Sequence, residues 1–284
     1  MTTVSYASLI RQGSNRLDQA GIEDPVRDSR RILLLASGLT PAQLIVREQD
    51  AAIPEHVEAY AMMLEMRADR TPYAHIAGEI EFYGLTMRCD SRALIPRADS
   101  EVVVDLALSH LPEAGALQIA DLGTGTGALL AALLVNRPEA RGIAIEASPA
   151  AAGLAAENFE ALDVTDRTHL FQGSWADWTG WELCDLIISN PPYIRSQVIS
   201  TLAPEVRDYD PLSALDGGDD GLHAYREIID LAAKHMKPGA VIVLEIGFDQ
   251  KTDVAALLTE HGFTDLTHKL DLGGNDRVIA ATKS

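Results

Sequence analysis

The sequence predicts an α/β protein in which a mostly parallel sheet of seven strands follows a small all-α domain. Three observations carry this prediction. From residue 117 onward, short apolar runs alternate with helical patterns, which is typical of a parallel sheet covered by helices on both faces. Residues 4–70 show helical periodicity and no convincing strand. A glycine-rich turn at 123–127 joins an apolar run to a helix, as the first strand and helix of many such sheets are joined.

The N-terminal part reads as four helices. The first, in SYASLIRQGSNRLDQAG, stops at Gly21, and the second begins with Asp24 as N-cap and Pro25 at the first helical position. A third short helix starts at Thr40, and IPEHVEAYAMMLEMRADR supplies the fourth. We therefore predict a helical domain over residues 1–70.

The rest of the chain divides into a connector and a larger domain. Residues 71–97 are predicted as a linker with a possible β-hairpin in GEIEFYGLTMRCD, and residues 98–284 as the α/β domain. Within that domain we expect strands at 117–122, 141–146, 168–172, 184–189 and 240–246, with a final pair at 264–270 and 276–282.

The charge composition limits the kinds of macromolecule that this protein can bind. The chain has 284 residues, 47% hydrophobic and 23% charged, and a net charge of −19. Residues 71–284 carry 15 basic against 32 acidic side chains, which repels phosphate backbones. We therefore expect no direct nucleic-acid partner, whereas a basic protein partner would be attracted.

Compartment and metal content can also be predicted. The N-terminus lacks the features of a signal peptide, and the most apolar region, 117–135, is interrupted by Asp121 and three glycines. Cys89 and Cys184 are far apart and have no neighbouring ligand pattern. These features predict a cytoplasmic protein with no membrane span, disulfide framework or metal site.

The glycine turn in LQIADLGTGTGALLAAL indicates a nucleoside-bearing cofactor. Gly123, Gly125 and Gly127 let the backbone approach a ligand, and the following helix directs its free N–H groups at the same place. About twenty residues later Glu146 ends the next strand, where a carboxylate can accept hydrogen bonds from both ribose hydroxyls. Gly123-x-Gly125-x-x-Ala128 also satisfies the dinucleotide fingerprint, so an NAD enzyme stays open here, as does a turn required only for packing.

The run LIISNPPYIR favours a different cofactor. Pro191 and Pro192 remove two N–H donors at the end of an apolar strand, which leaves acceptors, namely the Asn190 side-chain oxygen and a proline carbonyl. Such a loop suits a planar –NH₂ group, over which Tyr193 can pack. Holding both protons of a delocalised nitrogen prepares it to receive a methyl group, and this favours S-adenosylmethionine over NAD. A rigid proline turn without a ligand is the structural alternative.

Further motifs identify a family. The chain combines DLGTGTG and SNPPYI with FYG (82–84), LIPRADSE (94–101), EVRDYDPLSALDGGDDGL (205–222), LEIGFDQ (244–250) and GGNDRV (273–278). This combination resembles the HemK/PrmC family, protein-(glutamine-N5) methyltransferases that modify peptide chain release factors. The resemblance covers nearly the whole chain.

The resemblance implies a Rossmann-like methyltransferase sheet, S-adenosylmethionine as cofactor, and a helical domain that recognises the substrate. The implied cofactor-binding residues are Gly123, Thr124, Gly125, Thr126, Gly127, Glu146, Trp175, Asn190 and Arg97. The implied substrate-binding residues are Asn190, Pro191, Pro192 and Tyr193, of which Asn190, Pro191 and Tyr193 are the implied catalytic residues. A core-packing role for Trp175 stays open, as does a surface role for Arg97. The implied partner is a class 1 release factor, and we expect a monomer.

The chain departs from the family pattern in three places. The usual Pro-Arg-Pro-Glu-Thr-Glu run is Pro-Arg-Ala-Asp-Ser-Glu at 96–101, Glu146 stands where aspartate is more usual, and Asp210-Pro211 replaces Glu-Pro. The last change leaves the role of Asp210 open.

Several functions remain as alternatives. They are glutamine methylation of a large-subunit ribosomal protein, adenine-N6 methylation of nucleic acid, a non-catalytic binding module and a dehydrogenase. The family resemblance favours methylation of the glutamine amide in the Gly-Gly-Gln loop of a release factor.

Overall fold

The computed structural model describes residues 4–284, and the chain forms two compact units. One is Met1–Gly78 together with Ala203–Tyr209, and the other is Glu79–Leu202 together with Asp210–Ser284. The sequence predicted boundaries after residues 70 and 97. The structure extends the helical unit to Gly78, because α5 (Tyr73–Ala77) contacts helices of that unit, and it adds a short segment that lies far away in the sequence.

The helical unit is built from helices with defined starts. Asp24 accepts a hydrogen bond from the backbone N–H of Arg27, and Thr40 and Gln43 form a reciprocal capping box. Leu17, Ile32, Leu33 and Leu44 are fully buried in its core. The first four helices are α1 (Tyr6–Gln19), α2 (Pro25–Ser37), α3 (Pro41–Arg47) and α4 (Pro54–Ala68).

The added segment carries α10 (Pro204–Arg207) and is held in the helical unit by ion pairs. Arg67, on α4, donates to Asp28 at 2.7 Å and to Glu205 at 3.1 Å. Arg70 donates to the same Glu205 oxygen at 3.1 Å. The side chains of Arg67 and Asp28 are 9% and 7% exposed, so this is a buried cluster of charges.

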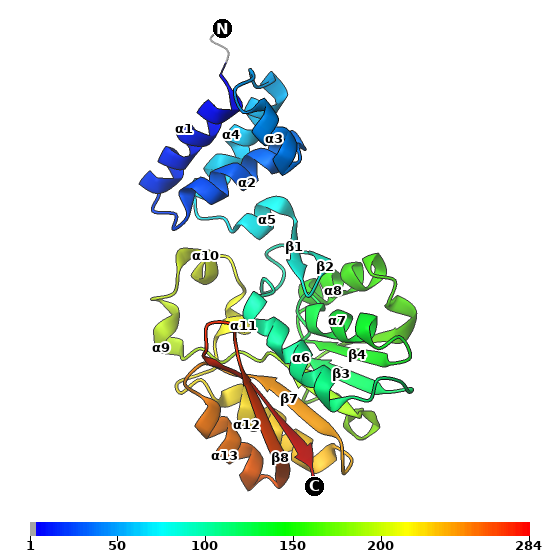
Figure 1. Ribbon diagram of the computed structural model, residues 1–284. Coiled ribbons are helices and arrows are strands. Elements are labelled where there is room, and N and C mark those ends of the chain that lie inside the picture. Colours follow the sequence, from blue (N-terminus) through cyan, green and yellow to red (C-terminus); the bar gives the residue numbers. More distant parts are fainter. Residues whose placement is uncertain (1–3) are drawn as a thin grey trace. The chain divides into compact units, whose positions relative to one another are not determined.

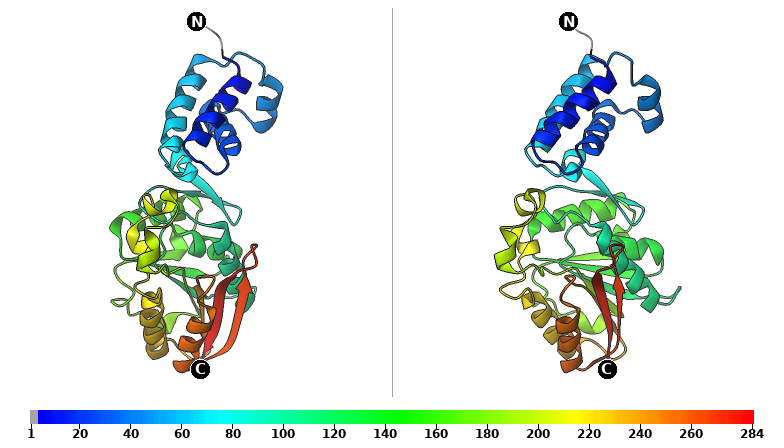
Figure 2. Two further views of the ribbon diagram at one scale, coloured as in Figure 1. Left: turned by 90° about the vertical axis from the view of Figure 1, so that its left-hand side faces the viewer. Right: turned by 60° about the vertical axis from the view of Figure 1, so that its left-hand side comes forward.

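The larger unit contains a sheet with these strands: β3 (Gln118–Leu122), β4 (Arg141–Glu146), β5 (Thr168–Gln172), β6 (Leu186–Ser189), β7 (Val241–Glu245), β8 (Phe263–Leu270) and β9 (Asp276–Lys283). Within residues 4–284 these seven strands lie in the order β5-β4-β3-β6-β7-β9-β8. The first five in sequence are parallel, and β9 runs antiparallel to both β7 and β8. Figure 2 shows β8 and β9, in orange and red, at one edge. The predicted fold class is confirmed.

Helices cover both faces of this sheet (Figure 1). The helical elements of this unit are η1 (Ala98–Ser100), α6 (Glu101–His110), α7 (Ala128–Asn136), α8 (Pro149–Ala161), η2 (Thr165–Arg167), η3 (Trp181–Leu183), α9 (Ser196–Ile199), α11 (Leu212–Leu215), α12 (His223–His235) and α13 (Lys251–Glu260). Alternate strand residues point to opposite faces, so Ile119 packs with α6, α7 and α8 while Ala120 packs with α12 and α13.

A hairpin introduces the larger unit. Its strands, β1 (Glu79–Phe82) and β2 (Leu85–Arg88), pair antiparallel, and Phe82 and Met87 are buried in the core beside α6 and α7. Among the helices that the structure describes, none combines the length and apolar character needed to cross a bilayer.

Candidate active site

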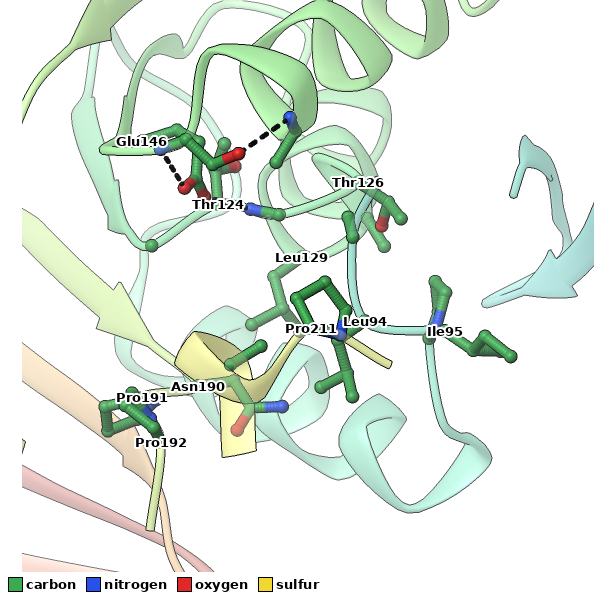
Figure 3. A pocket seen from close by; sticks show the side chains of 18 of the residues that line it. Leu94, Ile95, Thr124, Thr126, Leu129, Glu146, Asn190, Pro191, Pro192 and Pro211 are labelled. Atoms are coloured by element: carbon green, nitrogen blue, oxygen red, sulfur yellow. Dashed lines mark hydrogen bonds between the residues drawn. The ribbon is translucent and has the colours of Figure 1, made fainter. Parts of the chain in front are cut away.

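A cavity of about 230 Å³ opens at the carboxyl ends of the central strands (Figure 3). This is the edge at which open α/β sheets bind ligands. All of its lining residues belong to the larger unit. They come from the segments 92–97, 123–126, 146–148, 190–192 and 211–214, together with Phe82, Ser100, Ala128, Leu129, Ala151 and Trp175.

The sheet register brings the two predicted motifs together. β3 and β6 are parallel neighbours, and Leu122 pairs with Ser189 at their ends. The glycine turn and the Asn-Pro-Pro-Tyr loop therefore start side by side. In Figure 3, Glu146 and Thr124 lie on one side of the cavity, and Asn190 with its two prolines lies on the other.

The three glycines of the turn have different roles, although all have positive φ, at 72°, 57° and 83°. A Cβ on Gly125 would meet no atom closer than 4.0 Å, so a ligand can approach its backbone. A Cβ on Gly127 would lie 2.7 Å from the Phe159 ring, and Gly127 does not line the cavity. Gly127 is thus required for packing against α8, while Gly123, Thr124, Gly125 and Thr126 face the cavity.

Glu146 is oriented by the backbone on both sides. Its Oε2 accepts from the Gly125 N–H at 2.9 Å, and its Oε1 accepts from the Ser148 N–H at 2.9 Å. These bonds hold the carboxylate at the cavity wall. Each oxygen retains a lone pair that can accept a hydroxyl.

Asp121, at the end of β3, is a residue that the sequence reasoning missed as part of the site. It is 1% exposed, its Oδ2 accepts from the Thr124 hydroxyl at 2.7 Å, and its Oδ1 has no hydrogen-bond partner among the described residues. Burial raises the pKa of Asp121 to about 7, the Glu146 charge adds to this, and the Thr124 bond opposes it. Its position two residues before the first glycine of the turn was the available signal.

Asn190 presents an amide to the cavity. It follows β6 and lines the cavity together with Pro191 and Pro192. Within residues 4–284 no hydrogen bond from its side chain is found, so its oxygen and its NH₂ group are available to a ligand.

Tyr193 does not line the cavity, although the three residues before it do. Its hydroxyl donates to Glu245 Oε1 at 3.1 Å, and Arg277 lies 3.5 Å from the same hydroxyl. Burial raises the pKa of Tyr193, and the Glu245 charge raises it further. The ring packs in the core with α12, so the structure separates Tyr193 from the three residues that precede it.

Arg97 and Trp175 line the cavity, and each is fixed by a carboxylate. Arg97 donates to Asp210 Oδ2 at 2.6 Å, and the backbone N–H of Ile95 donates to the other oxygen at 3.3 Å. Asp210 therefore joins the 94–97 segment to the 210–214 segment. Trp175 donates from Nε1 to Glu227 at 2.7 Å, and its ring lies against the Gly123 backbone.

Comparisons with known proteins show to which family this chain belongs. Residues 8–78 match the family model described as the PrmC N-terminal domain, and residues 100–205 match the methyltransferase small domain. The release factor glutamine methyltransferase of Caulobacter vibrioides is 40% identical over 95% of this chain and 93% of its own length. That of Cereibacter sphaeroides is 42% identical over 97% of each chain. The chain belongs to the release factor glutamine methyltransferase family.

Membership of the release factor glutamine methyltransferase family confirms the resemblance found in the sequence. A solved methyltransferase from Pyrococcus furiosus, 16% identical, has the same fold with a TM-score of 0.50 and covers 72% of this chain and 91% of its own. The names of the relatives do not favour a dehydrogenase, an adenine-N6 methyltransferase or a methyltransferase of ribosomal proteins.

Proposed function

We propose that this protein transfers a methyl group from S-adenosylmethionine to the side-chain amide nitrogen of the glutamine in the Gly-Gly-Gln loop of a class 1 release factor. The observation that carries the proposal is the shared cavity. Asn190 and its two prolines face the same space as Glu146 and the glycine turn. One cavity can thus hold a nucleoside cofactor and a carboxamide together.

The residues of the cavity fit S-adenosylmethionine. Glu146 supplies a carboxylate for the ribose hydroxyls, and the open space beside Gly125 admits a ligand against the backbone. Trp175 offers an aromatic wall at the same end. Arg97, which donates a hydrogen bond to Asp210, closes another side of the cavity.

Bound S-adenosylmethionine supplies an electrophilic methyl group. The chain's own residues prepare the acceptor, because an amide nitrogen is a poor nucleophile while its lone pair is delocalised. The Asn190 side-chain oxygen and the Pro191 carbonyl accept the two N–H protons, which orients the nitrogen and lets positive charge develop there. Orientation and fixed dipoles then provide most of the catalysis, and the proton leaves after transfer.

We further propose that the helical unit recognises the body of the release factor and that the enzyme acts as a monomer in the cytoplasm, where translation ends. The helical unit matches a family domain of its own, which supports a function distinct from the chemistry. No contact with nucleic acid or membrane is required.

A methylation assay tests the proposal. The protein is incubated with labelled S-adenosylmethionine and purified release factor, and the Gly-Gly-Gln peptide is analysed by mass spectrometry. We expect one added methyl group on the glutamine and none after replacement of that glutamine by alanine. Absence of label on the intact factor, or label that survives the replacement, would overturn the proposal. Calorimetry with S-adenosylhomocysteine tests the cofactor site separately.

A further inference from the structure

Gln250, in the LEIGFDQ motif, contacts the Asn-Pro-Pro-Tyr loop from outside the cavity. It is 3% exposed and is the N-cap residue of α13. It does not line the cavity, and nothing in the proposed chemistry uses it directly. One of its hydrogen bonds nevertheless ends on the backbone carbonyl of Tyr193.

The Gln250 amide is saturated with hydrogen bonds. Its Nε2 donates to the carbonyl of Tyr193 at 3.0 Å and to that of Gly221 at 3.1 Å. Its Oε1 accepts from the Gly247 N–H at 2.9 Å and lies 3.5 Å from the Tyr225 hydroxyl. Carbonyls on one side and donors on the other fix the orientation of the amide.

Two glycines of the 205–222 motif allow this contact. A Cβ on Gly221 would lie 2.5 Å from the Tyr193 carbonyl oxygen, and a Cβ on Gly217 would lie 2.7 Å from the Tyr193 Cα. Larger residues would therefore displace the loop. Beside this contact, the Ile194 N–H donates to the Leu215 carbonyl at 3.0 Å, and the Gly217 N–H donates to the Ile194 carbonyl at 2.8 Å.

The loop between this contact and Asn190 is stiff. Only Pro191 and Pro192 separate Asn190 from Tyr193, and a proline ring fixes φ. Within this segment the two proline φ angles cannot adjust, so a shift of the Tyr193 carbonyl is transmitted in part to Asn190. A small displacement of groups that orient an acceptor is costly for transfer.

We propose that Gln250 is a positioning residue for methyl transfer: by holding the Tyr193 carbonyl, it sets the orientation of Asn190 and Pro191 toward the acceptor amide. This inference rests on the proposed function of the cavity. It assigns a role to the LEIGFDQ and DGGDDG motifs, and it makes Tyr193 the anchored end of the loop.

The substitution Gln250→Glu tests the inference, because it keeps the shape and the acceptor but replaces the NH₂ group with an oxygen that faces two carbonyls. We expect kcat to fall by about 10- to 100-fold at pH 8, while the Kd for S-adenosylhomocysteine changes less than about threefold. The activity of Q250E relative to the parent should rise as the pH is lowered to about 6, since a protonated carboxyl regains one donor.

Tyr225→Phe is the matched control. It removes a buried hydroxyl whose bonds go to the Glu245 carbonyl, at 2.8 Å, and to Gln250, and it leaves the Tyr193 carbonyl held. We expect Y225F to lower the Tm but to retain the kcat of the parent. If Q250E retains parental kcat, or if Y225F loses as much kcat as Q250E, the inference is wrong.

Hydrogen exchange separates this inference from the proposed function. In Q250E the amides of Ile194 and Gly217 should exchange faster, with exchange in α6 and α7 unchanged, and in Y225F they should not. Hydrogen exchange can be measured even if the parent protein methylates no release factor. Absence of methylation by the parent would overturn only the proposed function. Unchanged exchange at Ile194 would overturn the inference alone. If Q250E does not fold, Gln250→Met, which also lacks the donor, serves for kcat and exchange.

Discussion

Individual polar side chains in and behind the cavity either face its interior or hold the backbone of the segments that line it. Glu146 and Asn190 belong to the first group, and Asp210 and Gln250 to the second. Asp121 supports the glycine turn through Thr124 and is kept from water. Polar residues of both kinds are needed, since a ligand can be oriented only by groups that are themselves fixed.

Glu146→Gln should weaken cofactor binding. The glutamine side chain retains one acceptor oxygen but carries no charge. Its NH₂ group would face either a backbone N–H that now donates to Glu146 or the ribose hydroxyls. We expect the Kd for S-adenosylhomocysteine to rise by about tenfold or more, as calorimetry would measure. Glu160→Gln, on the exposed surface of α8, is the control and should bind as the parent does. Equal affinities of the parent and E146Q would exclude Glu146 from the ribose site.

Asp121→Asn should change how stability depends on pH. The pKa of Asp121 is raised to about 7 in the folded protein. The contribution of this carboxyl group to the free energy of unfolding is therefore fully present below its ordinary pKa of 3.8 and is lost as the pH rises through about 7. Relative to D121N, the parent should therefore lose about 2 kcal/mol of unfolding free energy between pH 5.5 and pH 8. Urea unfolding at both pH values measures this. Parallel pH profiles of the two proteins would contradict it.

At the scale of elements, the site is produced by strand order. β3 and β6 are adjacent although the 63 residues 123–185 lie between the end of β3 and the start of β6, and this adjacency brings the two loops to one cavity.

 The paired residues Leu122 and Ser189 are the last residues of their strands. The Ser189 hydroxyl also donates to the Leu122 carbonyl at 2.6 Å, which ties the two strand ends together.

Arg67→Ala should destabilise the helical unit through α10. It would leave the buried Asp28 and the partly buried Glu205 without their shared guanidinium, so we expect a loss of about 3–5 kcal/mol in unfolding free energy. Urea unfolding measures this. Arg16→Ala removes an exposed ion pair to Glu65 in the same unit and should cost far less. Equal losses in the two variants would show that α10 is not held by this cluster.

At the scale of the whole molecule, our proposal assigns the chemistry to the larger unit and recognition of the release factor to the helical unit. Every residue that lines the cavity belongs to the larger unit, and the net charge of −19 is concentrated in residues 71–284. Such a charge disfavours phosphate backbones and favours a basic protein surface.

Cofactor binding should therefore stabilise one unit selectively. At 100 times its Kd, S-adenosylhomocysteine should add about 2.7 kcal/mol to the unfolding free energy of the larger unit. Hydrogen exchange with and without the ligand measures this by segment. We expect added protection in β3, β4 and β6 and little in α1 and α2. Equal protection in both units would contradict the assignment of the cavity to the larger unit.

The sequence by itself determined the elements and the family. Strand and helix positions follow from local periodicity, caps and turn residues, and the predicted strands agree with the observed ones to within a few residues. The glycine turn and the Asn-Pro-Pro-Tyr run are recognisable because glycine and proline restrict the backbone locally, whatever surrounds them.

Only the tertiary structure decided which side chains meet. The direction of Tyr193, the bond between Arg97 and Asp210, the amide network of Gln250 and the place of residues 203–209 in the helical unit all depend on residues far apart in the sequence. Periodicity carries no information about such pairs. They are selected by strand order, burial and the need to satisfy every buried polar group, and these are properties of the folded chain.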